Sequence, residues 1–297
     1  MQANERLAPK NEAAAPVSGE AGTEAAPIVS VIIPACNCAA TIGRAIDSVL
    51  EQGVPLEILV LNDCSPDELD SVMERYENVR ELHYYKNKRS LGAAATRNLG
   101  VEKAKGTYVA FLDADDWWDR DKLKKQLARL ESGFSAGSDG GTGKKRDAAA
   151  PVLCATAREL VTPEGERTGR VIPVHEEISY RRLLLHNCIN CSSVLLRTDV
   201  ARQFPMQHED SHEDYITWLC ILKKYGSALA VNEPLLKYRL SASGKSGSKL
   251  HSAKMTYRAY RYAGFGKAAS VCLFSAYAVN GVLKYAGAYL RGFFRKK

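Results

Sequence analysis

Residues 106–118 limit the possible folds most, because a hydrophobic run ends there in three carboxylates. The run itself is β-branched, aromatic or small and lacks the polar alternation of a half-exposed strand. Such a segment is typical of a parallel strand covered by helices on both faces. Open sheets of this kind bind ligands at the carboxyl ends of their strands, where Asp113, Asp115 and Asp116 follow. Asp113 and Asp115 are therefore candidate ligands of one Mg²⁺ or Mn²⁺ ion, since both metals prefer oxygen donors.

A short Asp-x-Asp pattern has a second explanation, which is a solvated acidic loop. In that case Asp116 would cap the helix that follows and no metal would bind. The sequence on either side distinguishes the two explanations.

Strand-like and helix-like segments alternate through the first 131 residues. Hydrophobic strand patterns precede the central run at residues 28–33, 56–61 and 79–85, and helical spacing separates them at 41–52, 66–76 and 90–103. Ser65 is the expected N-cap of the second helix, with Pro66 at its first position. The alternation predicts an α/β fold with a mostly parallel sheet, helices on both faces and right-handed crossovers.

The rest of the chain divides by composition. Residues 1–27 are rich in Ala, Pro and Glu without apolar periodicity, which predicts a disordered leader. Residues 132–151 contain five glycines and almost no apolar residue, which predicts a flexible insertion. We therefore expect one domain over 28–245, with halves at 28–131 and 152–245, and a helical tail over 246–297.

Basic residues concentrate in that tail. The whole chain has a net charge of +7, yet residues 234–297 hold 13 Lys and Arg and no acidic residue, so residues 1–233 are net negative. This asymmetry argues against a nucleic-acid binder and favours one surface that meets an anionic partner. The apolar segment 268–283 is shorter than the ~20 residues of a spanning helix. An interfacial helix on an anionic membrane, or docking onto the domain, fits it better.

We expect the eight cysteines to be ordinary reduced thiols. Cys36 with Cys38, and Cys188 with Cys191 beside His186, are the pairs that zinc could use, but neither has a repeated finger-like spacing. No apolar secretory segment is visible in residues 1–27, so a reducing, cytoplasmic setting is expected.

Four motifs, at residues 29–37, 57–67, 91–100 and 112–117, together resemble the family 2 glycosyltransferases. These are inverting enzymes of the GT-A (nucleotide-diphospho-sugar transferase) fold, which move a sugar from a nucleotide diphosphate sugar to an acceptor. The order and spacing of the motifs match over about 90 residues, and residues 212–215 and 238–239 match more loosely.

The resemblance implies a donor site at the strand ends. Pro34 and Asn37 would shape the nucleoside pocket, and Asp63 would hydrogen-bond the base. Asp113 would contact the ribose and, with Asp115, hold the Mn²⁺ or Mg²⁺ ion that bridges the diphosphate. The family usually has an aromatic residue where this chain has Cys36, so base stacking is expected to be weaker here.

The resemblance also implies the catalytic groups. Asp116 would contact the donor sugar, Asp214 would be the general base and Glu213 the alternative base. A base of this kind accelerates transfer by typically about 10²–10⁴-fold. The structural alternative for Asp214 is a first-turn acid that stabilises the helix dipole.

The implied activity is metal-dependent, inverting transfer, with a UDP-sugar as the expected donor and a saccharide or lipid-linked saccharide as the acceptor. Such an enzyme would build a cell-surface polysaccharide, lipopolysaccharide or glycolipid, and would be peripheral on the cytoplasmic face of the membrane. Two other functions stay open. One is a non-catalytic nucleotide-sugar-binding scaffold. The other is a sugar-phosphate nucleotidyltransferase, although that class normally has a glycine-rich loop where this chain has Pro34 to Asn37.

Overall fold

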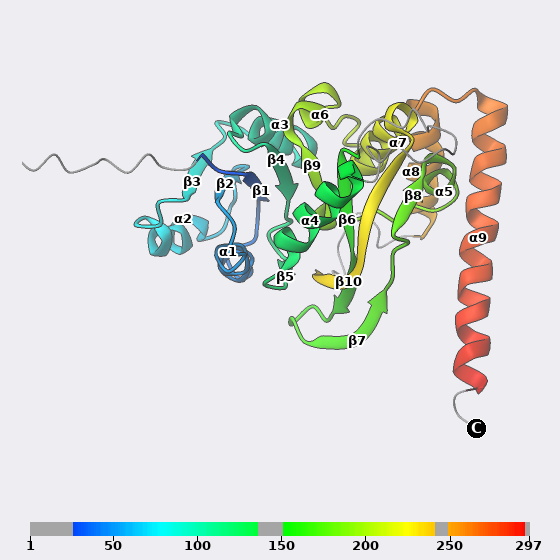
Figure 1. Cartoon of the computed structure of the whole chain (residues 1–297), viewed down its shortest axis with the longest axis horizontal. Helices are drawn as coiled ribbons and strands as arrows, with labels where there is room; N and C mark the ends of the chain where they lie inside the picture. The colour runs from blue at the N-terminus through cyan, green and yellow to red at the C-terminus, as the bar shows by residue number, and fades with distance from the viewer. Residues whose placement is uncertain (1–25, 136–150, 241–248, 295–297) are drawn as a thin grey trace, which may run out of the picture.

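The computed structural model describes residues 26–135, 151–240 and 249–294 (Figure 1). Most of the expected leader, most of the expected insertion and the Ser/Gly/Lys-rich loop at 241–248 lie outside these ranges.

The first half of the chain has the alternation that its hydrophobic pattern predicts. In order, it forms β1 (Val29–Ala35), α1 (Ile42–Leu50), β2 (Leu56–Asn62), α2 (Leu69–Met73), the 3₁₀ turn η1 (Glu74–Tyr76), β3 (Leu82–Lys86), α3 (Ala93–Lys103), β4 (Tyr108–Phe111), β5 (Trp117–Trp118) and α4 (Lys122–Ser135). The two tryptophans form a short strand of their own, which pairs with the end of the domain's last strand.

The second half interleaves strands and short helices. It forms β6 (Leu153–Val161), β7 (Arg167–Ile172), β8 (Glu177–Ser179), α5 (Tyr180–Leu185), the 3₁₀ turn η2 (Cys191–Ser193), β9 (Leu195–Arg197), α6 (Thr198–Gln203), α7 (Glu213–Tyr225), β10 (Ser227–Arg239), α8 (Lys249–Tyr262) and α9 (Lys267–Phe294). The hydrophobic pattern did not predict β7, because this strand is almost entirely exposed and pairs only with β6.

One ten-stranded sheet joins both halves, in the order β3-β2-β1-β4-β9-β6-β10-β5, with β7 and β8 attached at its side. The pairs β3–β2, β2–β1, β1–β4 and β6–β10 are parallel. Because β9 is antiparallel to both β4 and β6, these last two strands point the same way. The carboxyl ends of β1, β2, β4, β6 and β10 therefore lie at one edge of the sheet, and the mostly parallel α/β fold is confirmed.

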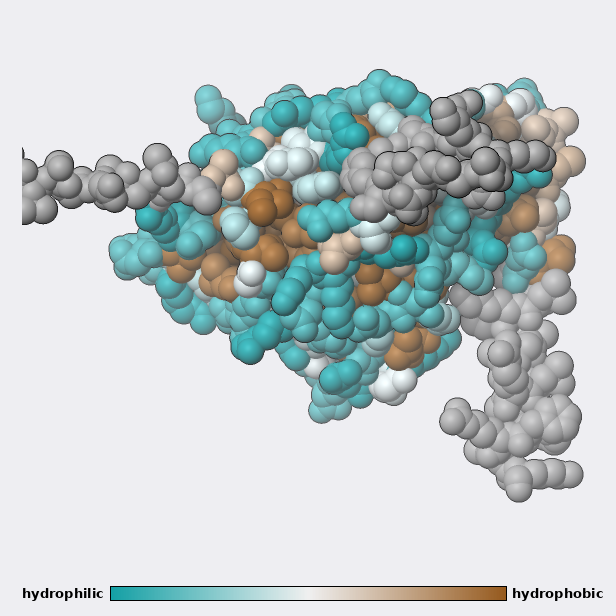
Figure 2. Space-filling model, viewed as in Figure 1, coloured by the Kyte–Doolittle hydropathy of each residue, from teal (hydrophilic) through white to brown (hydrophobic). Residues whose placement is uncertain are grey.

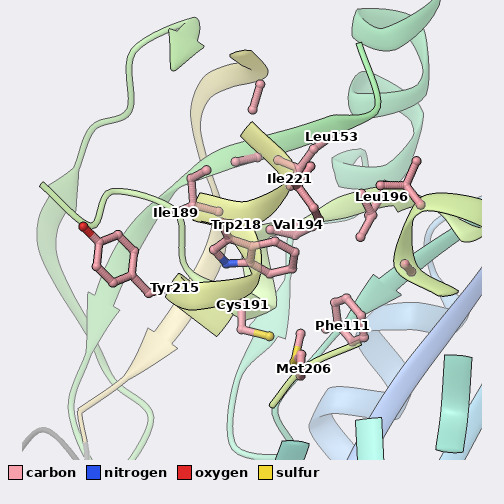
Figure 3. Packing of buried hydrophobic residues seen from close by; sticks show 14 of the residues in the cluster. Phe111, Leu153, Ile189, Cys191, Val194, Leu196, Met206, Tyr215, Trp218 and Ile221 are labelled. Atoms are coloured by element: carbon pink, nitrogen blue, oxygen red, sulfur yellow. The ribbon is translucent and has the colours of Figure 1, made fainter. Parts of the chain in front are cut away.

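Two hydrophobic cores sandwich the sheet, as Figure 1 shows by the helices on either side of it. Neighbouring residues of β1 alternate between them: Ile32 packs in the core under α3, α6 and α7, and Ile33 in the core under α1, α2 and α4. Figure 3 shows the first core around Trp218 of α7, whose ring centroid lies 6.3 Å from that of Phe111 at the end of β4. This packing sets the position of α7 relative to the central strand.

Two local expectations are wrong. Ser65 does not cap a helix, because α2 begins only at Leu69; its hydroxyl instead donates to the Asp67 carboxylate. The alternative explanation for Asp116, a cap of the next helix, is also wrong, because α4 begins only at Lys122. Asp116 is instead 2% exposed and accepts a hydrogen bond from the Arg239 amide.

The two C-terminal helices differ in their contact with the domain. Met255, Ala259 and Tyr260 of α8 are buried, so this helix belongs to the core. α9 runs along the end of the molecule farthest from α2 (Figure 1), with Val271 and Val279 on its exposed side at 53% and 56%. Within the described residues, no helix combines the length and the hydropathy needed to cross a membrane.

Candidate active site

The predicted donor-side residues gather at the carboxyl edge of the sheet. Pro34 is the next-to-last residue of β1, and Asn37 follows in the left-handed region with φ of 53°. The Asn37 amide donates to Ser65 Oγ over 2.6 Å, which ties the loop after β1 to the loop after β2. Asp63, directly after β2, donates its own amide to the Ala35 carbonyl. These contacts hold the two loops side by side.

The Asp63 carboxylate organises the loop before α3. It accepts hydrogen bonds from the amides of Leu91 and Gly92, at 2.7 and 2.9 Å, and from the side chains of Asn87 and Ser90, at 2.8 and 2.9 Å. Burial opposes the charge, but these four donors lower the pKa of Asp63. The carboxylate is therefore ionised and fully engaged by the protein, and base recognition by Asp63 stays a prediction.

The three carboxylates after β4 differ in environment. Asp113 and Asp115 are partly exposed, with the Asp113 side chain at 32%, and Asp116 is buried. Burial raises the pKa of both Asp115 and Asp116, and the negative charge of Asp113 raises them further. Mutual repulsion of this kind is what a bound cation relieves.

Two residues of the second half hold the loop that carries these carboxylates. The Ser192 hydroxyl of η2 accepts a hydrogen bond from the Asp113 amide at 3.1 Å. Trp118 Nε1 donates in turn to the Ser192 carbonyl at 2.8 Å, from a side chain only 3% exposed. On the other side, Arg239 Nε donates to the Asp115 carbonyl at 2.8 Å. The position of the carboxylates thus depends on η2 and on the end of β10.

Arg97 of α3 connects the two groups of acidic residues. Its Nη2 lies 2.6 Å from Asp113 Oδ1, and its Nη1 lies 3.1 Å from Glu213 Oε1. The side chains of Arg97 and Glu213 are 8% and 10% exposed, so both charges are shielded from water. Arg97 and the next residue, Asn98, both support the site. Arg97 does so directly, whereas Asn98 holds the Met206 backbone through hydrogen bonds in both directions.

Asp214 lies in the first turn of α7, next to Glu213. The pKa of Asp214 is raised to about 7, mainly by burial and next by the Glu213 charge, whereas Arg97 and the Tyr215 amide oppose the shift. A carboxylate with a pKa near neutrality is suited to general-base catalysis, because it combines proton affinity with a substantial ionised fraction. The helix-dipole explanation alone predicts a lowered pKa at this position, which is the opposite of the shift found.

A cavity of about 400 Å³ joins these residues. Asp113, Arg97, Glu213 and Asp214 line one side. The remaining wall comes from the second half of the chain and both C-terminal helices: Arg158, Asn187, Ile189, Asn190, Cys191, His212, Tyr238, Ser252 and Tyr277. The cavity wall therefore includes Ser252 and Tyr277, which the sequence analysis placed in the helical tail. No sequence motif indicated that the tail would line the cavity.

A larger depression of about 620 Å³ lies at the opposite edge, near Pro55, Glu57 and Lys105 at the amino ends of the strands. It is remote from the carboxylates and from every predicted site residue. We therefore examine the smaller cavity as the candidate site, because it is the one that contains the predicted residues Asp113, Glu213 and Asp214.

The side chains at the carboxyl edge suit a divalent ion of the Mg²⁺ or Mn²⁺ type. Asp113 and Asp115 supply oxygen donors, and such ions commonly bind one or two carboxylates with substrate phosphates completing the shell. Within the described ranges, no three His, Cys, Asp or Glu side chains are grouped as a metal cage. A divalent ion at this site would therefore be held partly by the protein carboxylates and partly by the substrate phosphates.

The α/β fold and the acidic residues at the carboxyl edge of its sheet match the arrangement expected of a nucleotide-sugar transferase. The profile of the protein family described as "Glycosyl transferase family 2" matches residues 30–194. The chain belongs to glycosyltransferase family 2 and is a glycosyltransferase.

Named bacterial glycosyltransferases align with most of this chain. WfaP of Escherichia coli, a UDP-Glc:alpha-D-GlcNAc-diphosphoundecaprenol beta-1,3-glucosyltransferase, is 30% identical over 88% of this chain and 97% of its own length. TuaG of Bacillus subtilis (strain 168), a proposed teichuronic acid biosynthesis glycosyltransferase, is 34% identical over 79% of this chain and 88% of its own.

Solved structures confirm the GT-A fold. Residues 1–349 of S. aureus TarS, crystallised with UDP-GlcNAc, superpose with a TM-score of 0.60 at 18% identity, over 84% of this chain and 71% of that one. The mannosyltransferase PcManGT from Pyrobaculum calidifontis, in complex with GDP-Man and Mn²⁺, gives 0.57 at 17% identity over 90% and 81%. At these identities the likeness concerns the fold alone.

Proposed function

We propose that this glycosyltransferase moves a sugar from a UDP-sugar to a lipid-linked saccharide, with inversion and with the help of Mn²⁺ or Mg²⁺, in the synthesis of a cell-surface polysaccharide or glycolipid. The observation that carries the proposal is the placement of Asp214. It shares one cavity with Asp113, and its pKa is raised by burial to about 7.

The donor side follows from Asp113 and Asp115. Cleavage of the bond between the anomeric carbon and the diphosphate leaves an anionic leaving group, and a divalent ion neutralises that growing charge. Asp113 and Asp115 would hold the ion. The expected contact of Asp116 with the sugar is not kept in this proposal, because Asp116 is 2% exposed and accepts a hydrogen bond from the Arg239 amide. Pro34, Asn37 and Asp63 would form the nucleoside pocket, with the Asp63 carboxylate already anchoring the loop beside it.

The acceptor side follows from Asp214. An acceptor hydroxyl that enters the cavity would lose its proton to the Asp214 carboxylate as its oxygen attacks the anomeric carbon. Attack from the face opposite the diphosphate, in a single displacement, inverts the anomeric configuration. Glu213 is the less suitable base, because its carboxylate is already paired with Arg97.

The donor and acceptor classes are supported by relatives rather than by the cavity itself. WfaP and WfgD of Escherichia coli are both named as UDP-Glc:alpha-D-GlcNAc-diphosphoundecaprenol beta-1,3-glucosyltransferases, and they are 30% and 29% identical to this chain. An acceptor on a lipid diphosphate also explains why an enzyme of this kind would work next to a bilayer.

The C-terminal region supports peripheral binding to the cytoplasmic face of a membrane. Residues 234–297 carry 13 basic and no acidic residues, which favours anionic headgroups. Figure 2 shows hydrophobic residues on the described part of α9. Val271 and Val279 of this helix are exposed. Binding to vesicles containing phosphatidylserine should weaken with added salt and in a V271S/V279S double variant. Equal binding by both proteins at low and high salt would contradict the proposal for this helix.

The proposed reaction is tested by product analysis. The protein is incubated with UDP-glucose, UDP-GlcNAc or UDP-galactose, Mn²⁺ and synthetic GlcNAc-diphospholipid, and the product is examined by mass spectrometry and proton NMR. A single added hexose or N-acetylhexosamine with the anomeric coupling constant of the inverted linkage supports the proposal. A product that retains the donor configuration would contradict the single displacement.

A further inference from the structure

Arg158 lies on the wall of the candidate cavity. Among the described residues, no carboxylate lies within ion-pairing distance of its guanidinium. Arg158 lies near the carboxyl end of β6, in a cavity that also exposes Asp113, Glu213 and Asp214. Arg97, on the same wall, is already paired with Asp113 and Glu213. Within the described part of the chain, Arg158 Nε is buried and donates to no hydrogen-bond acceptor. A guanidinium in this state is costly to keep unless a ligand pairs with it.

The surroundings of Arg158 are rigid and partly aromatic. Its guanidinium carbon lies 5.8 Å from the centre of the Tyr238 ring on β10, the strand that pairs with β6. Both residues line the cavity. Burial lowers the pKa of Arg158, while the negative charges of Asp116 and Asp214 oppose that shift. An arginine stays charged even so, because its ordinary pKa exceeds about 12.

The cavity that Arg158 faces lies on the acceptor side. Its wall includes the general-base candidate Asp214 together with residues of α8 and α9. Of the predicted donor residues only Asp113 reaches it, and Pro34, Asn37, Asp63 and Asp115 are absent from its lining. A molecule that fills this cavity and presents a hydroxyl to Asp214 is therefore the acceptor.

We propose that Arg158 binds a phosphoryl group of the acceptor, and so selects acceptors that carry their saccharide on a phosphate or diphosphate. The proposal rests on the function proposed above and names the residue that recognises the phosphoryl group of the acceptor. Three carboxylates on the wall would otherwise repel an anionic acceptor. The planar guanidinium of Arg158 offers paired donors that match phosphate oxygens, which a lysine cannot reproduce.

The test measures binding and not turnover, so its outcome is separate from that of the proposed function. Farnesyl diphosphate, farnesol and UDP with Mn²⁺ are titrated into the full-length protein and into R158Q, R158K and R181Q. Arg181 is an exposed arginine of α5, so R181Q is a matched control for the loss of one positive charge. Circular dichroism melting of each variant shows whether it is folded.

The proposal predicts that R158Q binds farnesyl diphosphate roughly 10- to 100-fold more weakly, as expected for the loss of a charge-assisted contact. R158K should bind with intermediate affinity, R181Q like the wild type, and farnesol and UDP equally to all four proteins. Weaker binding of UDP with unchanged binding of farnesyl diphosphate would place Arg158 on the donor diphosphate and overturn the proposal. Unchanged binding of all three ligands, or an equal loss in R181Q, would also overturn it.

Discussion

Arg97 donates through one guanidinium nitrogen to Asp113 and through the other to Glu213, at 2.6 and 3.1 Å. The candidate metal ligand and the acidic pair at the start of α7 are thereby joined by a single buried side chain. The two carboxylates come from opposite halves of the chain, so Arg97 fixes the distance between the donor and acceptor sides. It also moderates the pKa of Asp214, which its positive charge lowers.

Replacing Arg97 by Met should raise the pKa of Asp214 further, because the opposing positive charge is lost. The acid limb of the kcat/KM profile should then move to higher pH. The unpaired, largely buried Glu213 should also lower the free energy of unfolding by on the order of 3 kcal/mol. Nucleotide release measured between pH 5 and 9, with thermal melting alongside, checks both effects.

Arg97→Lys is the matched control for that experiment. Lysine keeps the positive charge, but its single ammonium group cannot pair with Asp113 and Glu213 through two separate nitrogens as the guanidinium does. Its pH profile should stay close to that of the wild type while its activity falls. An equal shift of the acid limb in both variants would mean that Arg97 acts through geometry rather than charge.

The activity of the wild type should depend on pH in a way set by Asp214. The base must be ionised to accept a proton, and its pKa is raised to about 7, so kcat/KM should rise up to about pH 7 and then level off. Asp214→Asn should lose about 10²–10⁴-fold in rate, and its residual activity should lack this limb. A limb that persists unchanged in the variant would assign it to another group.

Asp214→Asn should also be more stable than the wild type above neutral pH. The unfolded carboxyl has a pKa of about 3.9, below the folded value of about 7. The wild type therefore loses stability as the pH rises through this window, whereas Asn does not titrate. The gap should open between about pH 4 and 7 and reach on the order of 2 kcal/mol, allowing for the partial exposure of the side chain. Chemical denaturation at pH 4.5 and 8 measures it, and an equal gap at both values would contradict the raised pKa.

Asp115→Ala should weaken metal-dependent activity more than a change to a nearby exposed acid. Asp115 is a candidate ligand, whereas Asp121 is exposed at the start of the next helix. The Mn²⁺ concentration for half-maximal nucleotide release should rise at least about tenfold in Asp115→Ala, which corresponds to about 1.4 kcal/mol in binding. Asp121→Ala should match the wild type. Equal metal dependence in all three proteins would remove Asp115 from the metal site.

The sequence predicted the first half of the fold well because local pattern and tertiary environment agree there. The run through β4 is hydrophobic without alternation since both faces are covered, and Ile32 and Ile33 of β1 do pack in different cores. The pattern failed where tertiary contacts decide. Trp117 and Trp118 form a strand only because β10 pairs with them, and the exposed β7 depends on β6 in the same way.

The same division holds for the site. That Asp113, Glu213 and Asp214 lie at one site could be expected from the sequence, because each lies in a motif of recognisable residue types; the three line one cavity, and their roles stay predictions. The role proposed for Arg158 could not be predicted, because it depends on the absence of a carboxylate partner in the folded protein. Nor could the roles of Ser192 and Trp118, since hydrogen bonds between residues 74 or more positions apart leave no local pattern.

The central claim is that Asp115 and Asp214 are the metal-binding and base-supplying parts of one transferase site. The most direct test is release of nucleotide from UDP-, GDP- and dTDP-sugars, with and without Mn²⁺ and in the presence of a lipid-linked acceptor, by wild type, Asp115→Ala and Asp214→Asn. We predict Mn²⁺-dependent release from a UDP-sugar by the wild type and its loss in both variants. Release that persists in Asp214→Asn at the wild-type rate, or donor binding without turnover by any of the three proteins, would contradict the account.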